Sequence, residues 1–142
     1  MGNDSRAGVA ALGAHMFHLE VDGLSCASFT RCDGLGVRRE VLAYCEGGAV
    51  APRIFRGREL ASSIVLERGV FRDTTLWSWY LRGDPRDGAV VLLGRNGEEV
   101  ARWRFLRGWP SAWTGPSLDA NEAAIALESL EIAHEGIEWV AR

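Results

Sequence analysis

Residues Glu98 to Trp139 read EEVARWRFLRGWPSAWTGPSLDANEAAIALESLEIAHEGIEW, and this stretch indicates the fold class of the chain. Apolar and charged residues alternate within it, as in the A-R-W-R-F of residues 101–105. Such alternation is typical of a strand with one buried face and one charged face. A Gly-Pro pair marks a turn between the apolar segments. We therefore expect mainly β structure, with four tryptophans in this region: Trp103, Trp109, Trp113 and Trp139.

A hairpin is the clearest local prediction. The expected strands, Ala89–Gly94 and Glu98–Arg107, flank the pair Asn96-Gly97. That dipeptide favours a two-residue type I′ turn. The residues of the second strand expected to face the core are Ala101, Trp103 and Phe105.

Other strands are predicted where a period of two, or a run of Val, Tyr and Arg, is bounded by turn residues. Met16–Asp22 alternates in this way and ends at an Asp-Gly pair. The remaining expected strands are residues 27–31, 37–46 and 62–67. Residues 49–58 contain a proline, a glycine and three arginines, and we interpret them as a loop or an exposed hairpin arm.

One short helix is predicted between Asp73, which can cap its start, and Gly83, which can end it. About three helical turns are not stable alone, so an apolar stripe must pack on a sheet or into a barrel mouth. The residues of this stripe are Leu76, Trp77, Tyr80 and Leu81, and Trp77 is expected inside the protein.

The segment Glu122–His134, EAAIALESLEIAH, has two interpretations. Its residues are good helix formers, so propensity favours a helix. As a strand, it alternates at Ile125 and Leu127 and then changes phase near Glu128, as a bulge or a strand buried on both faces does. The pattern alone favours the helix.

The composition fits a single globular domain of 142 residues, 47% hydrophobic and 25% charged. Residues 1–14 are rich in Gly and Ala, and we expect a flexible arm there, followed by one domain over residues 15–142. Neither a signal peptide nor a run of about 18 apolar residues is apparent. We expect synthesis and folding in the cytoplasm.

The charge is unevenly distributed along the chain. The net charge of −3 argues against a basic nucleic-acid-binding protein. All 16 basic residues are arginines. Residues 38–107 carry 13 arginines against 9 acids, whereas residues 108–142 carry one against six. Unlike surfaces of this kind suit head-to-tail contact between copies of the chain.

No constellation of catalytic, cofactor-binding or metal-binding residues is recognisable. His15 and His18 on a strand point to opposite faces, as do the adjacent His134 and Glu135. The serines lack a nucleophile elbow, and the glycines lack the setting of a phosphate loop. The odd set of three cysteines, without a CxxC pair, is expected to be free and buried: Cys26, Cys32 and Cys45.

Three blocks of sequence, taken in order, resemble the tail tube proteins of contractile phage tails and contractile injection systems. Residues 17–36, FHLEVDGLSCASFTRCDGLG, are similar to the opening hairpin of that family. Residues 57–79, GRELASSIVLERGVFRDTTLWSW, resemble its middle strand and helix. Residues 99–136 resemble its end, with A-R-W-x-F, a W-P turn, a G-P-x-L loop and a closing E-x-L-E-I-A-H-E-G strand.

The resemblance implies a compact β-barrel or sandwich with one short helix, at about residues 73–82, and a fold shared with the haemolysin-coregulated ring protein. It also selects a strand rather than a helix over Glu122–His134. Residues 44–58 would match an extended loop that reaches the next ring. The contact residues expected from this likeness are Glu46, Gly47, Gly48, Arg53, Arg56, Arg58, His134 and Glu135.

The function implied is structural: six-subunit rings stacked into a hollow tube whose lumen is a continuous β surface. The implied partners are further copies of the chain, a contractile sheath, baseplate proteins, and proteins that initiate or terminate the tube. The payload would be DNA or a protein effector, and the assembled particle would be released from the cell or remain a phage tail. The alternative is a small β-barrel that binds a ligand through Trp109 and Trp113.

Overall fold

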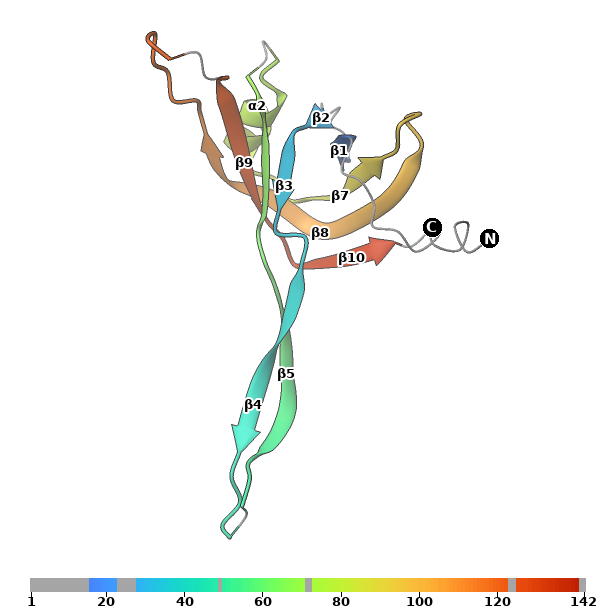
Figure 1. Ribbon diagram of the computed structural model, residues 1–142, viewed down its shortest axis with the longest axis vertical. Helices are drawn as coiled ribbons and strands as arrows, with labels where there is room; N and C mark the ends of the chain where they lie inside the picture. The colour runs from blue at the N-terminus through green and yellow to red at the C-terminus, as the bar shows by residue number, and fades with distance from the viewer. Residues whose placement is uncertain (1–15, 23–27, 49, 71–72, 123–124, 141–142) are drawn as a thin grey trace, which may run out of the picture.

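The computed structural model describes residues 16–22, 28–48, 50–70, 73–122 and 125–140. The expected arm at residues 1–14 lies outside these residues. The described chain is a β-barrel with a long hairpin projecting from it and a short helix against it (Figure 1). Its elements are β1 (Met16–Val21), β2 (Ser28–Phe29), β3 (Arg31–Asp33), β4 (Val37–Tyr44), β5 (Arg53–Ala61), β6 (Ile64–Gly69), α2 (Thr75–Arg82), β7 (Arg86–Leu93), β8 (Glu99–Thr114), β9 (Leu127–Ala133) and β10 (Gly136–Val140).

The barrel closes through its shortest strands. Neighbouring strands follow the order β2-β1-β7-β8-β9-β6-β3, and every observed pair is antiparallel. The first and last strands of this path are separated in the chain by Thr30 alone, whose N–H donates to the Glu67 carbonyl at 2.9 Å. The sheet therefore returns to its starting point, which removes the exposed edges of an open sheet.

The core lies inside the barrel and comes from inward-facing residues at alternate positions along most strands, whereas β7 is buried at four consecutive residues, 89–92. Leu19 of β1 pairs with Val90 of β7, Ile64 of β6 pairs with Ile132 of β9, and Phe105 of β8 belongs to the same buried cluster. All of these side chains are almost completely buried. The alternation that predicted strands thus also selects the core, although Trp103 is only half-buried, stacked on the exposed Trp139.

One strand, β8, belongs to both sides of the barrel because it bends in the middle. Its first half pairs with β7 and β10, and its second half pairs with β9. At the bend Arg107 has a φ of 48°, and its N–H donates to the Asp87 carboxylate at 2.9 Å. A Cβ at Gly108 would lie 2.4 Å from the Phe105 ring, so the bend requires glycine there.

The hairpin between β7 and β8 differs from the predicted type I′ turn. Gly97 has a φ of 79°, but Asn96 has no positive φ, which a type I′ turn requires. The Gly97 N–H donates to the Gly94 carbonyl at 3.0 Å, and the Gly94 N–H donates to the Glu98 carbonyl at 2.8 Å. The connection is therefore a three-residue loop that ends in a left-handed glycine. It is one residue longer than the two-residue turn predicted from the Asn-Gly pair.

Helix α2 begins and ends near the expected residues but buries a different face. The Thr75 N–H donates to the Asp73 carboxylate at 2.7 Å, and Gly83 ends the helix with a φ of 67°. Leu76 and Trp79 are the buried residues of the helix, whereas three residues of the expected stripe are partly exposed: Trp77, Tyr80 and Leu81. The prediction for Trp77 was wrong because its indole packs on the outer aromatic residues Tyr80 and Trp113 rather than in the core.

Residues Leu127–Ala133 form strand β9, so the strand implied by the family resemblance over Glu122–His134 is confirmed in its second part, whereas Glu122, Ile125 and Ala126 are not in a strand. The strand lies between β6 and β8, and Leu130 and Ile132 are fully buried. Tertiary pairing thus overrides local propensity in this segment.

A buried ion pair links β6 to β9. Arg68 on β6 is almost inaccessible, and its Nε donates to the Glu128 carboxylate at 2.5 Å. A second nitrogen of the guanidinium lies 3.2 Å from the Asp73 carboxylate just before the helix, and the guanidinium lies over the Phe29 ring. One side chain therefore ties together two strands and the start of the helix.

We predict that Glu128→Gln lowers the free energy of unfolding by about 3–5 kcal/mol, because it leaves the buried Arg68 charge without its main counter-charge. The measurement is urea unfolding followed by circular dichroism. The double variant Arg68→Met/Glu128→Leu removes both charges and is expected to recover most of the loss. A double variant no more stable than Glu128→Gln would contradict this account.

The hairpin of β4 and β5 leaves the barrel at a tightly packed turn. Gly34 has a φ of 90°, and a Cβ there would lie 1.9 Å from the Ser63 carbonyl oxygen. We call the residues at this junction, Gly34, Gly36, Ser62 and Ser63, the hairpin root. The Ser62 N–H and the Gly36 carbonyl close it at 3.5 Å.

We predict that Gly34→Ala lowers the free energy of unfolding by roughly 2–4 kcal/mol, because it combines a disfavoured φ with a backbone clash. Gly36→Ala is the matched control: nothing lies within 4 Å of its Cβ position and its φ is not positive. Thermal unfolding of both variants checks the prediction. Equal midpoints for the two alanine variants would show that the root does not restrain the chain.

Candidate assembly surface

The hairpin of β4 and β5 is the main surface feature outside the barrel. Its two strands pair from Val37↔Ala61 to Tyr44↔Arg53, so the ribbon covers residues 37–61. The expected loop at residues 44–58 is therefore the outer part of a longer, regular hairpin. Figure 1 shows this hairpin extending well away from the barrel.

A bulge interrupts the ribbon near its middle. The register passes from Arg39↔Glu59 to Val41↔Arg56, so β5 contains one extra residue opposite Glu40. A Cβ at Gly57 would lie 2.6 Å from the Glu40 Cβ, and Arg58 Nε donates to the Glu40 carboxylate at 2.8 Å. A bulge adds twist to the strands, and it keeps the bare edges of the ribbon from being flat.

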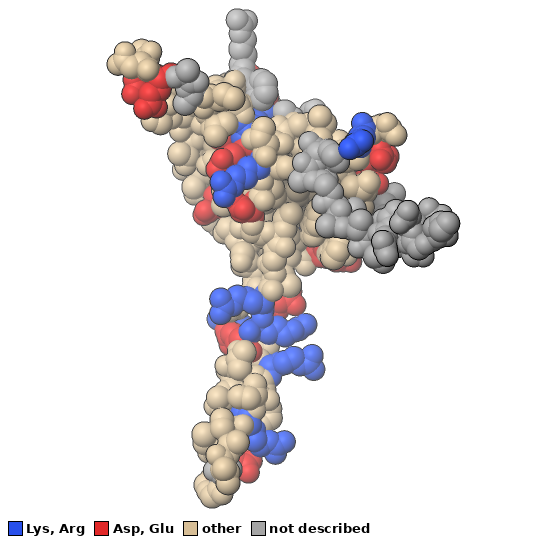
Figure 2. Space-filling model, viewed as in Figure 1, with Lys and Arg blue, Asp and Glu red and all other residues tan. Residues whose placement is uncertain are grey.

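Arginine side chains gather along the hairpin (Figure 2). Five arginines stand against three glutamates between residues 37 and 61, a balance of +2. Arg58 pairs with Glu40 and Arg39 with Glu59, while Arg53 lies over the Phe55 ring, 5.7 Å from its centroid. The three arginines expected as contacts, Arg53, Arg56 and Arg58, are all exposed on β5.

The tip of the hairpin contains Glu46, Gly47 and Gly48, which are exposed as expected. Gly48 has a φ of 85°, so it supplies the left-handed position of this turn. Cys45 is also exposed here, which makes the prediction of a buried thiol wrong at this position. Cys32 is partly buried, and Cys26 lies outside the described residues.

His134 and Glu135 lie at the opposite end of the hairpin, beside its root. His134 Nε2 lies 2.7 Å from the Ser62 carbonyl, and the Gly136 N–H donates to His134 Nδ1 at 3.2 Å. The ring of His134 thus links the end of β5 to the turn before β10. Glu135 pairs with Arg107 at 2.6 Å. The structure therefore gives both residues a local role and separates them from the tip.

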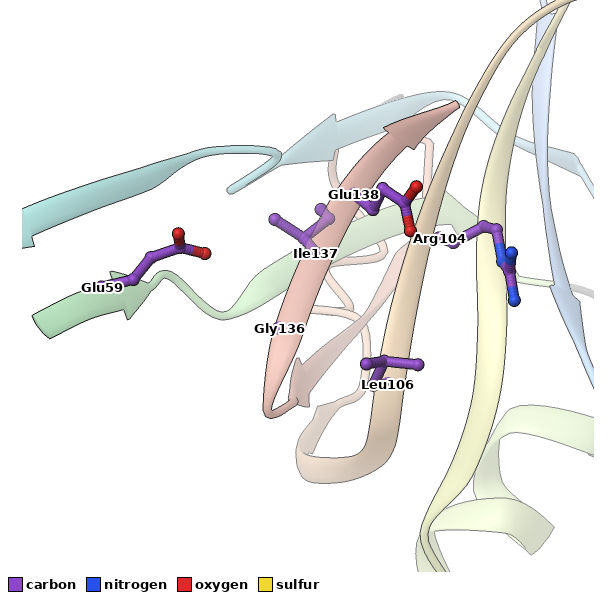
Figure 3. Close-up of a pocket in the computed structure, with 6 residues that line it drawn as sticks. All are labelled: Glu59, Arg104, Leu106, Gly136, Ile137 and Glu138. Atoms are coloured by element: carbon purple, nitrogen blue, oxygen red, sulfur yellow. The ribbon is translucent and has the colours of Figure 1, made fainter. Parts of the chain in front are cut away.

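Strand β10 lies outside the closed path of the barrel and pairs with β8 alone among the described strands. Its second edge has no strand partner there. A pocket lies between this part of the sheet and the hairpin, where Glu59 of β5 approaches residues of β8 and β10 (Figure 3). The lining residues are Glu59, Arg104, Leu106, Gly136, Ile137 and Glu138. The lining thus combines two glutamates and an arginine with two apolar side chains and a glycine.

The tryptophans proposed as ligand anchors do not line this pocket. Trp113 packs against Trp77 with ring centroids 4.9 Å apart, and Trp109 is exposed on β8. Within the described residues, no group of three or more metal-ligating side chains is present. None of the described helices is long and apolar enough to span a bilayer.

Comparison with protein families identifies the family of the chain. The family of T4-like virus tail tube protein gp19 matches residues 13–138. The chain belongs to this tail tube family. Its members are structural proteins and not enzymes. No curated protein sequence matches the chain.

Solved structures show the same fold. One is described as an extracellular contractile injection system, PVC sheath-tube complex in the extended state; its chain is 22% identical, with a TM-score of 0.86 over 100% of this chain and 99% of that one. A chain of the anti-feeding prophage tube terminating cap is 21% identical, with a TM-score of 0.83 over 93% and 92%. Hcp1 from Flavobacterium johnsoniae is 18% identical, with a TM-score of 0.56 over 88% and 94%.

The two described cysteines are expected to react at very different rates in the dissociated tail tube protein. Burial, and then the charge of Asp33, raises the pKa of the Cys32 thiol to about 12, so it stays protonated at neutral pH. Cys45 is exposed. Timed alkylation followed by peptide mass spectrometry is expected to find Cys45 modified at least about tenfold faster than Cys32. Equal alkylation rates for Cys45 and Cys32 would contradict this prediction and would show that Cys45 is protected in the dissociated protein.

Proposed function

We propose that this tail tube protein forms six-subunit rings that stack into a hollow tube inside a contractile injection system or phage tail. The observation that carries the proposal is the hairpin, which is long, rich in arginine, apolar at its outer end and projects away from the barrel. A monomeric protein gains nothing from such an extension, because an isolated two-stranded ribbon is at best marginally stable in water. Contact with further copies would stabilise it.

Charge and edge geometry support assembly from copies of the same chain. The hairpin carries +2 within a chain of −3, so the remainder carries −5. The tip residues Glu46, Gly47 and Gly48 and the arginines of β5 are the proposed contacts with the next ring. The edge of β10 that has no strand partner among the described residues offers a place for a neighbour to pair, as edge strands do. His134 would contribute by holding the root in place through the Ser62 carbonyl, and Glu135 would contribute through its ion pair with Arg107.

The proposed partners follow from the family and from the structures that share the fold. Those structures include a sheath-tube complex, a sheath/tube terminator, a baseplate and a tube terminating cap. By analogy, this chain would contact a contractile sheath, a baseplate and a terminating protein. The lumen of its tube would carry a protein effector or DNA.

We predict that reversing Arg53, Arg56 and Arg58 to glutamate abolishes stacking of rings and leaves the barrel folded. The substitutions place negative hairpins against the negative remainder of the next copy. Electron microscopy and sedimentation velocity at rising protein concentration, with circular dichroism as the folding check, measure the effect.

The matched control replaces the same three arginines by glutamine. It shortens the side chains similarly without adding negative charge, so stacking is expected to weaken and not to vanish. Raised salt is expected to weaken wild-type stacking as well, because exposed charges are screened. Tubes of normal length from the glutamate variant would rule out the hairpin as the contact between rings.

A further inference from the structure

The outer half of the hairpin is apolar on both of its faces. Directly paired residues of an antiparallel ribbon lie on the same face, and successive residues alternate between faces. The pairs Val41↔Arg56 and Ala43↔Ile54 define one face, which we call the Val41 face. The pairs Leu42↔Phe55 and Tyr44↔Arg53 define the other, the Leu42 face.

Each face exposes large apolar side chains to solvent in the single chain. On the Val41 face, Val41 is 72% exposed and Ile54 is 62% exposed. On the Leu42 face, the exposed fractions are 49% for Leu42, 58% for Tyr44 and 47% for Phe55. Each face also has one arginine, Arg56 or Arg53, and neither arginine is in an ion pair within the described residues. The two faces therefore have the same chemical character.

This pattern differs from that of a ribbon lying on one surface. A strand with one wet face alternates between apolar and polar residues, whereas a strand covered on both faces is a nearly continuous apolar run. The hairpin has the second pattern in Val41–Tyr44 and again at Ile54-Phe55. Exposed apolar surface of this extent on both sides indicates two interaction surfaces.

We infer that the outer half of the hairpin is held between two different copies of the chain, one covering the Val41 face and the other the Leu42 face. This inference rests on the proposed tube. Copies of the chain are the fitting occupants, because the arginines on both faces meet a remainder that carries −5. A single barrel surface covers only one face of a ribbon, so two faces require two copies.

A tube offers two such neighbours, one around the ring and one in the next ring. Covering each face by a different neighbour couples the two directions of assembly through a single element. One face then serves closure of the ring, and the other serves stacking. The bulge at Gly57 lies between the root and the outer half, where it adds the twist that turns these faces relative to the barrel.

The test places charges on one face at a time. Val41→Glu/Ile54→Glu alters the Val41 face, and Leu42→Glu/Phe55→Glu alters the Leu42 face. Each variant is expected to raise the protein concentration needed for tubes roughly a hundredfold or more, because charges replace buried apolar groups. Negative-stain electron microscopy and sedimentation velocity are expected to find different arrested species: isolated rings for one variant, and monomers or small oligomers for the other.

The matched control is Val41→Ile/Ile54→Val, which exchanges similar volumes on one face and is expected to form tubes at the wild-type concentration. Circular dichroism reports the fold of each variant. If the glutamate variants lose the fold, a cysteine introduced at position 41 or 42 in a Cys45→Ser background gives a second reading, with labelling located by peptide mass spectrometry because Cys26 and Cys32 remain. Both sites are expected to resist a hydrophilic maleimide in intact tubes and to react after dissociation.

Tubes at the wild-type concentration from either glutamate variant, arrest of both at the same species, or labelling of one site in intact tubes would overturn the inference. These results differ from failure of the proposed function itself. Wild-type protein that remains monomeric at every concentration would contradict the proposed tube. Wild-type tubes, together with tubes at the wild-type concentration from one glutamate variant, would contradict only the contact on both faces.

Discussion

The bend of β8 at Arg107 and Gly108 is the constraint on which the rest of the structure depends. A straight strand of 16 residues would continue past the barrel, with only one sheet along its length. The positive φ of Arg107, its bond to Asp87 and the absence of a Cβ at Gly108 turn the strand. Its two halves therefore pair with β7 and β10 on one side of the barrel and with β9 on the other.

A closed barrel determines where the chain can form contacts with other molecules. Closure satisfies the backbone groups of most strands internally, so few edges remain for pairing. What remains among the described strands is the outer edge of β10 and the whole of the hairpin. The root keeps these two features together, because His134 in the turn before β10 bonds to the Ser62 carbonyl at the end of β5. The fold thus separates a closed barrel from a projecting hairpin, and in the proposed function the hairpin is the element that contacts neighbouring copies.

The pairing of charged side chains also differs between the barrel and the hairpin. Inside the barrel, Arg68 is matched to Glu128 and Asp73, and on its surface Arg102 joins Glu20 and Glu99. The hydrogen bond from Arg102 holds the pKa of Glu20 below its usual value, as expected for a carboxylate that is stabilised in the charged form. The outer hairpin is different, since Arg53 and Arg56 face solvent beside apolar side chains. Arginine suits contacts between subunits because its planar group can pair with carboxylates at two points.

The sequence by itself indicated mainly β structure, several of the strands, the short helix and the family. Alternation in residues such as Ala101 and Phe105 reports burial directly, because successive strand side chains point to opposite faces. Local pattern was insufficient where the outcome depends on a distant partner. Residues 127–133 are a strand because β6 and β8 bond to both sides of them, and Trp79 rather than Trp77 is buried because the barrel lies on that side of the helix. Only the tertiary structure showed the length of the hairpin, the place of His134 at its root and its two apolar faces, since register and exposure are properties of paired strands and not of one segment.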